Sequence, residues 1–342
     1  MKVREQSMVP RAEFESYYGK PVLKRPVWKV PDVPLYFFLG GMAGAAAPMA
    51  LLADATGRHR LAAVGRFLAA SGALASVVAL VHDLGNPRRF LNMLRIFRPT
   101  SPLSVGSWIL APFSAAATGA VVSKSTGLFP PLGRLASGVA AVTGPALCSY
   151  TAVLVADTAV PAWHEAYPQL PFVFAGSGLA SASGAAMVLA PGTEQGPARR
   201  AAVFGAVMEL TALRRVERRG DLVTEPYRTG RAGRLLTAAR ALTGAGAVLG
   251  AAAEVAAEVA DGISGRGTGS GGRSVRRVRV ASRLLAGIGG VALVAGGLCS
   301  RFGVFDAGLA SAEDPAYVVV PQRERLRRAE PAGPVGTATP QG

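Results

Sequence analysis

The sequence is poor in the residues from which redox and metal sites are usually built. It contains two cysteines, Cys148 and Cys299, and three histidines among 342 residues. Two isolated cysteines exclude a disulfide framework, a CxxC motif and the four thiolates of an iron–sulfur cluster. His59, His82 and His164 all fall outside the apolar runs, so none is placed to ligate a haem inside a membrane. We therefore expect no haem and no iron–sulfur cluster in this chain.

Charged residues are scarce as well, at 17% of the chain, and several long stretches have none. Residues 33–53, 103–122, 135–156 and 171–193 contain no Asp, Glu, Lys or Arg. Each stretch reaches the roughly 20 residues that an α-helix needs to cross about 30 Å of hydrocarbon. The sequence therefore predicts an all-α integral membrane protein.

Weaker apolar runs raise the predicted number of transmembrane helices to eight. The run at 199–217 differs from the others, because its apolar part is short and contains Glu209. With eight crossings, the side that holds the N-terminus carries nearly twice as many Lys and Arg as the other side, whereas seven crossings leave no bias. Lys and Arg collect in cytoplasmic loops. We therefore expect both termini in the cytoplasm and eight helices in the cytoplasmic (inner) membrane, at 34–53, 61–81, 103–122, 135–156, 171–190, 199–217, 234–257 and 282–300.

Residues 1–33 and 301–342 are predicted to be tails that flank a transmembrane domain at 34–300. Neither tail is suited to form a core of the size that a catalytic domain requires. Any chemistry must then lie within the helix bundle or on another subunit. The net charge of +16 is spread over short loops beside the apolar runs. Membrane topology explains this charge, so we expect a lipid bilayer and no nucleic acid as a partner.

Polar residues gather on the side of the membrane that holds the N-terminus. Tyr36 begins the first predicted helix, His82 and Asp83 end the second, and Tyr150 and Asp157 end the fourth. Tyr150 and Asp157 are seven residues apart and therefore share one stripe of their helix. A tyrosine and an acid on one stripe, with a histidine on a neighbouring helix, could hold a molecule that gains or loses protons.

Simpler interpretations exist for some of these residues. His82 and Asp83 can cap a helix end, and the aromatic belt of a membrane protein can account for Tyr36, Trp108 and Trp163. Glu209 is different, because an acid in the middle of a membrane helix is costly and usually functional. We consider Glu209 and Asp157 as the start of a proton path.

Three segments resemble the NrfD/PsrC-like family of membrane subunits, to which the membrane subunit of polysulfide reductase belongs. They are LYFFLGGMAGAAA at 35–47, HDLGNPRRFLNMLRIFRPTSPLSVGSW at 82–108 and YTAVLVADTAVPAWHEAYPQLPFVFAGSGLASA at 150–182. The resemblance implies a haem-free bundle of eight helices that exchanges electrons and protons with menaquinone. It also implies a ferredoxin-like 4Fe-4S subunit as partner and, through it, a molybdopterin or other catalytic subunit.

In this family the quinone pocket lies near the start of the first helix and the end of the fourth. Tyr150 is the position that looks like the family's quinone-binding tyrosine. The start of the first helix carries Asp32, Pro34 and Tyr36 in place of the family's polar partners, and His82 is a candidate substitute. The expected quinone-binding residues are Tyr150, His82, Asp83, Tyr36 and Asp157.

The connection at 82–102 is expected to line this pocket and to dock the iron–sulfur subunit through Arg88, Arg89, Arg95 and Arg98. Plain positive-inside signalling explains these arginines equally well. Because the chain is expected to hold no redox centre, electrons must pass directly to a partner's cofactor, which places the pocket near one membrane face. The charge count puts that face in the cytoplasm, whereas the resemblance to polysulfide reductase puts it outside; we follow the charge count.

Two other functions are open at this point. A transporter would use broken helices at the midplane, and Pro48, Pro112 and Pro145 do interrupt predicted helices, although the two halves of the chain show no convincing repeat. A structural anchor would hold a partner at the membrane without binding quinone, and it would tolerate Tyr150→Phe.

Overall fold

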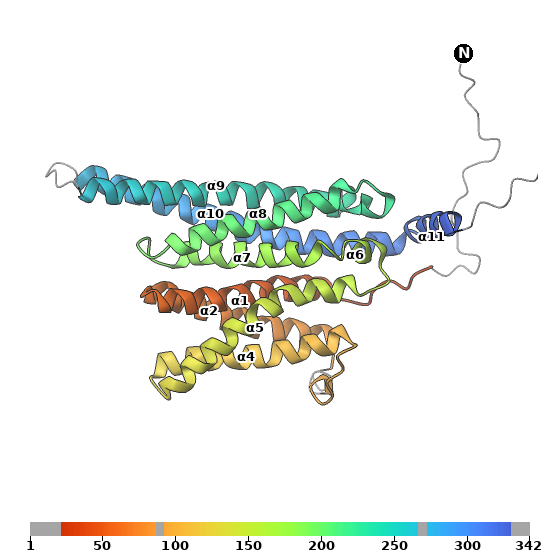
Figure 1. The fold of residues 1–342 in the computed structure, drawn as a ribbon, viewed down its shortest axis with the longest axis horizontal. Coiled ribbons are helices and arrows are strands. Elements are labelled where there is room, and N and C mark those ends of the chain that lie inside the picture. Colours follow the sequence, from red (N-terminus) through yellow and green to blue (C-terminus); the bar gives the residue numbers. More distant parts are fainter. Residues whose placement is uncertain (1–21, 87–91, 266–271, 330–342) are drawn as a thin grey trace, which may run out of the picture.

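The computed structural model describes residues 22–86, 92–265 and 272–329, which form a bundle of long α-helices without any strand (Figure 1). Three short elements lie at one end of the bundle: α6 (Pro161–Glu165), the 3₁₀-helix η1 (Leu222–Tyr227) and α11 (Ala316–Ala329). The long helices are α1 (Asp32–Ala55), α2 (His59–Leu84), α4 (Pro102–Thr126), α5 (Pro130–Ala156), α7 (Leu170–Leu189), α8 (Gly196–Arg218), α9 (Gly230–Gly265) and α10 (Gly272–Glu313).

The long helices form two groups. Helices α1, α2, α4 and α5 pack on one another, and α7, α8, α9 and α10 form the second group. Contacts of α7 with α1 and α5, and of α1 with α10, join the two groups. Helix α1 therefore lies at the centre of the bundle, which agrees with its many buried residues.

Seven of the described helices are long and apolar enough to cross a membrane: α1, α2, α4, α5, α7, α9 and α10. Helix α8, which corresponds to the predicted span at 199–217, carries more charge and does not meet this measure. Its 23 residues nevertheless pack against α7 and α9 and bury Glu209. The predicted class of an all-α membrane bundle is confirmed, with seven apolar helices and α8 packed among them.

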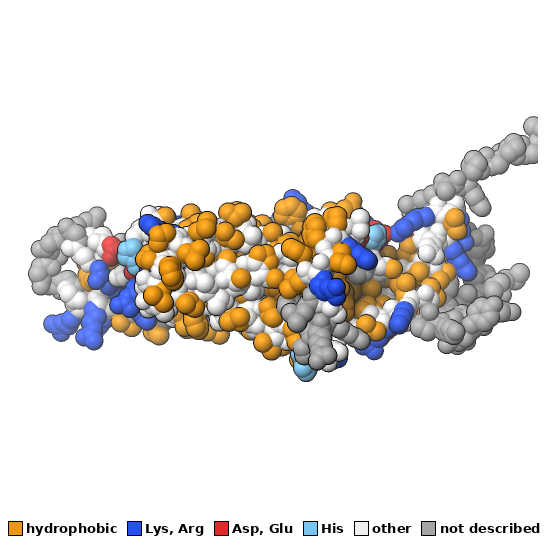
Figure 2. Space-filling model, turned by 90° about the horizontal axis from the view of Figure 1, so that it is seen from below, with side chains coloured by type: hydrophobic (Ala, Val, Ile, Leu, Met, Phe, Trp, Pro, Cys, Tyr) orange, Lys and Arg blue, Asp and Glu red, His pale blue; other side chains and the backbone are white. Residues whose placement is uncertain are grey.

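The sides of the bundle are apolar on the outside. Phe67, Val78, Val142, Phe204 and Val248 are each more than half exposed. Figure 2 shows hydrophobic side chains along the length of the molecule, with Lys and Arg gathered mainly toward the ends. A soluble protein rarely exposes so continuous an apolar surface. The protein is therefore a multi-pass membrane protein whose sides face lipid.

Glycines allow several helix backbones to touch. A Cβ on Gly44 of α1 would lie 2.4 Å from the carbonyl oxygen of Gly144 on α5. A Cβ on Gly184 of α7 would lie 2.7 Å from the carbonyl oxygen of Gly290 on α10. Close packing of this kind holds helices together in lipid, where hydrophobic burial offers little driving force.

Helix α10 continues beyond Ser300 to Glu313, where the sequence led us to expect a tail. Arg301 ends the uncharged run and was therefore placed outside the membrane domain, but its side chain is buried. Its guanidinium donates to the carbonyl oxygen of Phe174 at 2.7 Å and lies 3.8 Å from the centre of the Phe174 ring. The bundle supplies these partners, so the helix can continue through a buried charge.

An aromatic cluster fixes the final turns of α10 against the segment before α1. Trp163 of α6 stacks on Trp28 with ring centres 5.5 Å apart, and Phe305 of α10 contacts both rings. The indole nitrogen of Trp163 donates to the carbonyl oxygen of Val304 at 2.7 Å. Trp163 is fully buried, so the aromatic-belt interpretation is wrong for this residue.

Candidate functional site

Tyr36 and Tyr150 meet between α1 and α5. Both side chains are buried, with 3% and 7% of their surface exposed. Their hydroxyl groups are close enough to influence each other electrostatically. The ring of Tyr150 also lies directly on Gly106 of α4, since a Cβ at that position would be 1.8 Å from the tyrosine hydroxyl oxygen. Three helices therefore fix the position of the Tyr150 hydroxyl group.

His82 lies beside the first residue of α1. Its Nδ1 atom is 2.7 Å from a carboxylate oxygen of Asp32. Asp32 and Tyr36 are four residues apart and therefore lie on the same face of α1, one turn from each other. The His82 side chain is 73% exposed, so its second ring nitrogen faces the outside of the bundle. An imidazole held by a carboxylate in this way is a suitable proton acceptor.

The other predicted site residues have different surroundings. Asp83 accepts a hydrogen bond from the backbone nitrogen of Lys29 at 2.9 Å, which ties the segment before α1 to the end of α2. Asp157 follows the last residue of α5 and is exposed, whereas Tyr150 is buried. Tyr150 and Asp157 were predicted to share one face of their helix, but their side chains lie in different environments.

The arginines predicted to dock a partner are only partly described. Arg88 and Arg89 lie outside the described residues. Arg95 and Arg98 are exposed, and the backbone nitrogen of Arg98 donates to Ser104 at 3.0 Å, which holds this connection to the start of α4. Trp108, which was also assigned to the aromatic belt, is 42% exposed. The docking role of the four arginines stays a prediction.

A second polar centre lies inside the bundle. Glu209 of α8 and Arg301 of α10 are both buried and attract one another. The hydroxyl of Thr243 is 3.4 Å from a Glu209 carboxylate oxygen. Among the described residues, several buried polar atoms have no hydrogen-bond partner, including one Glu209 oxygen, two Arg301 nitrogens and the hydroxyls of Ser177 and Ser300. Unpaired polar groups of this kind are suited to hold water in a protein interior.

Two residues of these sites were missed by the sequence reasoning. Arg301 is the first charge after an apolar run, so it was taken as the end of a transmembrane helix. The sequence before it does not indicate that the Arg301 side chain is buried. Nothing in the sequence distinguishes Gly106 from the other glycines of the chain, which has 42 in total. Asp32 was noticed, but its pairing with His82 depends on how α1 and α2 approach, which hydropathy does not indicate.

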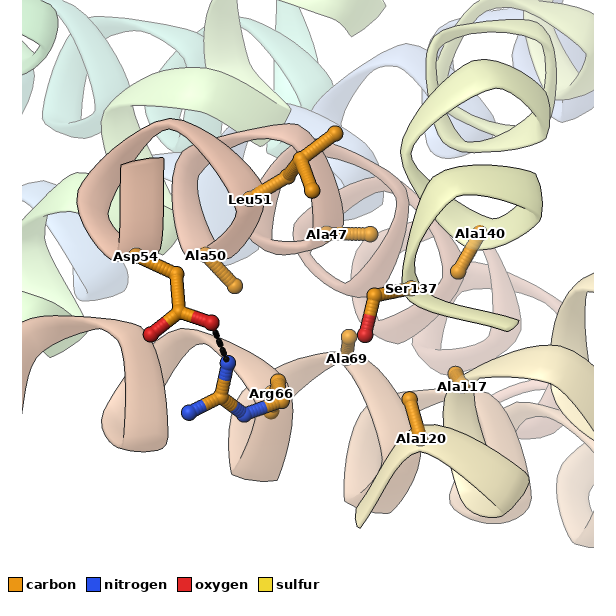
Figure 3. A pocket seen from close by; sticks show the side chains of 10 residues that line it. All are labelled: Ala47, Ala50, Leu51, Asp54, Arg66, Ala69, Ala117, Ala120, Ser137 and Ala140. Atoms are coloured by element: carbon orange, nitrogen blue, oxygen red, sulfur yellow. Dashed lines mark hydrogen bonds and ion pairs between the residues drawn. The ribbon is translucent and has the colours of Figure 1, made fainter. Parts of the chain in front are cut away.

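Four cavities occur among the described residues at other places, and none of these four is lined by Tyr36 or Tyr150. One of them, at the far end of α1, has a volume of about 20 Å³, and Arg66 donates there to Asp54 at 3.2 Å. Figure 3 shows the side chains that line it. This volume suits one water molecule and not an organic ring. No group of three or more His, Cys, Asp and Glu side chains that could hold a metal ion occurs in the described part of the chain.

Comparison with known proteins identifies a family. The family described as polysulphide reductase, NrfD, matches residues 21–210, which is more than half of the chain. The matched part contains Tyr36, His82, Gly106 and Tyr150. No curated protein matches the chain significantly.

Proposed function

Because the chain belongs to the NrfD family of membrane subunits of redox complexes, we propose that it exchanges electrons and protons between menaquinone and an iron–sulfur partner subunit. The partner is a ferredoxin-like 4Fe-4S subunit, which passes electrons to or from a molybdopterin or other catalytic subunit. The complex lies in the cytoplasmic membrane, with the Tyr36 end of the bundle at the cytoplasmic face.

The observation that carries this proposal is the arrangement of Tyr36, Tyr150 and the Asp32–His82 pair at one end of the bundle. Two buried hydroxyl groups provide donors for a quinone carbonyl. An exposed imidazole, already bound to a carboxylate, lies one helical turn farther out. Hydrogen-bond donors and a proton acceptor suit a quinone, because its reduction and oxidation move protons together with electrons.

The residues of this end have separate tasks in the proposed reaction. Quinol oxidation releases two electrons and two protons. Tyr150 donates a hydrogen bond to one quinone oxygen and orients the ring, while Gly106 holds the Tyr150 ring in place. His82 accepts the first proton on its outer ring nitrogen, passes it to the solvent outside the bundle and then accepts the second, while the Asp32 carboxylate stabilises the imidazolium formed each time. Electrons leave directly to the partner's cluster across the exposed end.

The experiment that tests this function compares two histidines. His82 pairs with Asp32 at the Tyr36 end, and His59 pairs with Asp54 at 3.1 Å at the opposite end. Their side chains are almost equally exposed, at 73% and 74%. We expect His82→Ala to slow quinol oxidation by the purified complex about 100-fold, the lower range for loss of an acid–base group, and His59→Ala to leave the rate unchanged.

Stopped-flow oxidation of a soluble menaquinol analogue measures this difference. Equal rates for the two variants would rule out His82 as the proton acceptor. Failure of the wild-type complex to bind or oxidise the analogue, with its fold intact, would instead favour the structural anchor.

We further propose that Glu209 carries protons between the interior and the quinone end. Its buried carboxylate faces Arg301 and unpaired hydroxyl groups, which together can hold a chain of water molecules. Glu209→Gln keeps the shape of the side chain and removes its proton. We expect proton uptake by proteoliposomes during quinol turnover to fall about tenfold or more.

Glu217→Gln is the matched control for this measurement, since Glu217 lies two turns farther along α8 and pairs with Arg240. A pH-sensitive dye inside the vesicles reports the proton movement. Unchanged uptake in Glu209→Gln would remove Glu209 from the path.

A further inference from the structure

An arginine-rich cavity opens at the end of the bundle opposite to Tyr36 and Tyr150. It lies between the start of α8, the last turns of α9 and the first turns of α10, and it has a volume of about 720 Å³. Arg58, which lies between α1 and α2, also lines the cavity. Its place shows that the cavity is at the end of α1 opposite to Tyr36. The lining contains six arginines against three acidic side chains, so the cavity has an excess of positive charge.

One arginine of the cavity is buried and held by hydrogen bonds. Arg199 of α8 is 2% exposed, although an arginine is rarely buried without partners. It donates to Gln195 at 2.9 Å and to Glu254 of α9 at 3.3 Å. Gln195 in turn donates to the carbonyl oxygens of Met187 and Ala190 at the end of α7. The Nε atom of Arg199 is buried without a partner, so this guanidinium, which lines the cavity, retains an unsatisfied donor.

The other cationic side chains come from the first turns of α10. Arg276, Arg279 and Arg283 line the cavity and are exposed. Arg279 pairs with Asp261 at 3.0 Å, whereas Arg276 and Arg283 make no ion pair with any described residue. Two unpaired guanidinium groups beside a buried third form a site for an anion with several oxygens, such as a phosphate.

The depth of the cavity in the membrane indicates where such an anion comes from. Arg283 is the last charge before the uncharged run at 284–300 and therefore marks the border of the hydrocarbon. Below it on α10, Leu284, Ile288 and Val291 are exposed and apolar. Helices α9 and α10 extend past the other helices at this end (Figure 1). The phosphates of a bilayer lie at this level, with their acyl chains alongside such apolar residues.

We propose that this cavity binds the phosphate headgroup of an anionic phospholipid. Arg199, Arg276 and Arg283 hold the phosphate, Arg200 and Arg279 are balanced by Glu254 and Asp261, and the acyl chains lie along the exposed apolar residues of α9 and α10. The bound lipid joins α8, α9 and α10 at a point where their own packing leaves a space. This site is separate from the quinone-binding end and does not depend on the proposed function.

The test uses two pairs of arginines on the same helix. Arg276→Gln with Arg283→Gln removes the two unpaired cations of the cavity, and Arg273→Gln with Arg277→Gln removes two cations of α10 that are also exposed but do not line it. Native mass spectrometry of the detergent-purified chain counts bound phosphatidylglycerol during a titration. We expect the cavity pair to weaken lipid binding about 30-fold and the control pair to have little effect, since each cation near a lipid phosphate contributes about a factor of five.

Competition separates the possible sources of the phosphate. Phosphatidylcholine and inorganic phosphate, each added in excess, should leave phosphatidylglycerol bound to the wild-type chain. Displacement by inorganic phosphate would assign the cavity to a soluble anion and overturn the lipid assignment. Equal loss in the two arginine pairs, or no retained phosphatidylglycerol in the wild-type chain, would also overturn it.

Discussion

Replacing Tyr150 with phenylalanine is expected to weaken the binding of a menaquinol-site inhibitor by about 10- to 100-fold and to slow quinol oxidation by a similar factor. The change removes one hydroxyl group and leaves the ring on Gly106. A hydrogen bond lost in a buried site, with its partner left unpaired, costs about 1–3 kcal/mol, which corresponds to this range of affinities. Titration of a fluorescent inhibitor against the purified protein measures the affinity directly.

Tyr227→Phe provides the matched control for Tyr150→Phe. Tyr227 is also buried, and its hydroxyl donates to the carbonyl oxygen of Ala162 at 3.0 Å. Its loss should lower the melting temperature and leave the inhibitor affinity unchanged. Wild-type affinity in Tyr150→Phe would contradict the proposed hydrogen bond and favour the structural anchor, which needs no quinone contact.

Gly106→Ala is expected to have an effect as large as the loss of Tyr150 itself. The added Cβ would lie 1.7 Å from Cζ of the Tyr150 ring, so either the ring must leave its place or α4 must move away from α5. Overpacking of this kind costs about 1–3 kcal/mol. We expect a lower melting temperature together with loss of inhibitor binding, measured by thermal denaturation and by titration.

Two further variants separate this clash from a general effect of alanine in α4. At Gly119, also in α4, a Cβ would be 4.0 Å from its nearest neighbour, so Gly119→Ala should be neutral or slightly stabilising. In a Tyr150→Leu background, Gly106→Ala should lose most of its cost, because the ring that it meets is gone. Equal effects of Gly106→Ala in both backgrounds would show that the Tyr150 ring does not set the requirement for glycine.

Hydropathy was enough to locate the long helices, because a membrane helix must be apolar along most of its length. Hydropathy failed to locate the end of a helix where partners inside the bundle stabilise a buried charged side chain. Arg301 was taken as the end of a span, yet the Phe174 carbonyl and Glu209 allow α10 to continue to Glu313. Glu209 itself was recognised correctly as a buried acid, since its apolar neighbours in the sequence made that position unusual.

The sequence predicted on which membrane face the candidate site lies, but it did not predict which side chains of the site contact one another. Counting crossings was enough to place Tyr36, His82 and Tyr150 on the same side, because every second connection returns to that side. Which side chains meet depends on helix rotation and approach. The sequence therefore gave no sign that Asp32 holds His82, that Tyr150 lies on Gly106, or that Asp157 is exposed apart from Tyr150.

The aromatic cluster also determines what an optical signal from this protein can report. The chain has three tryptophans, and Trp28, Trp163 and Trp108 all lie at the Tyr36 end of the bundle. Intrinsic emission is thus a local probe of that end, sensitive to anything that docks or moves there. Events in the arginine-rich cavity at the other end should be silent by this signal, so a fluorescence melting curve reports the Tyr36 end alone, whereas a circular dichroism curve reports the helices of the whole molecule.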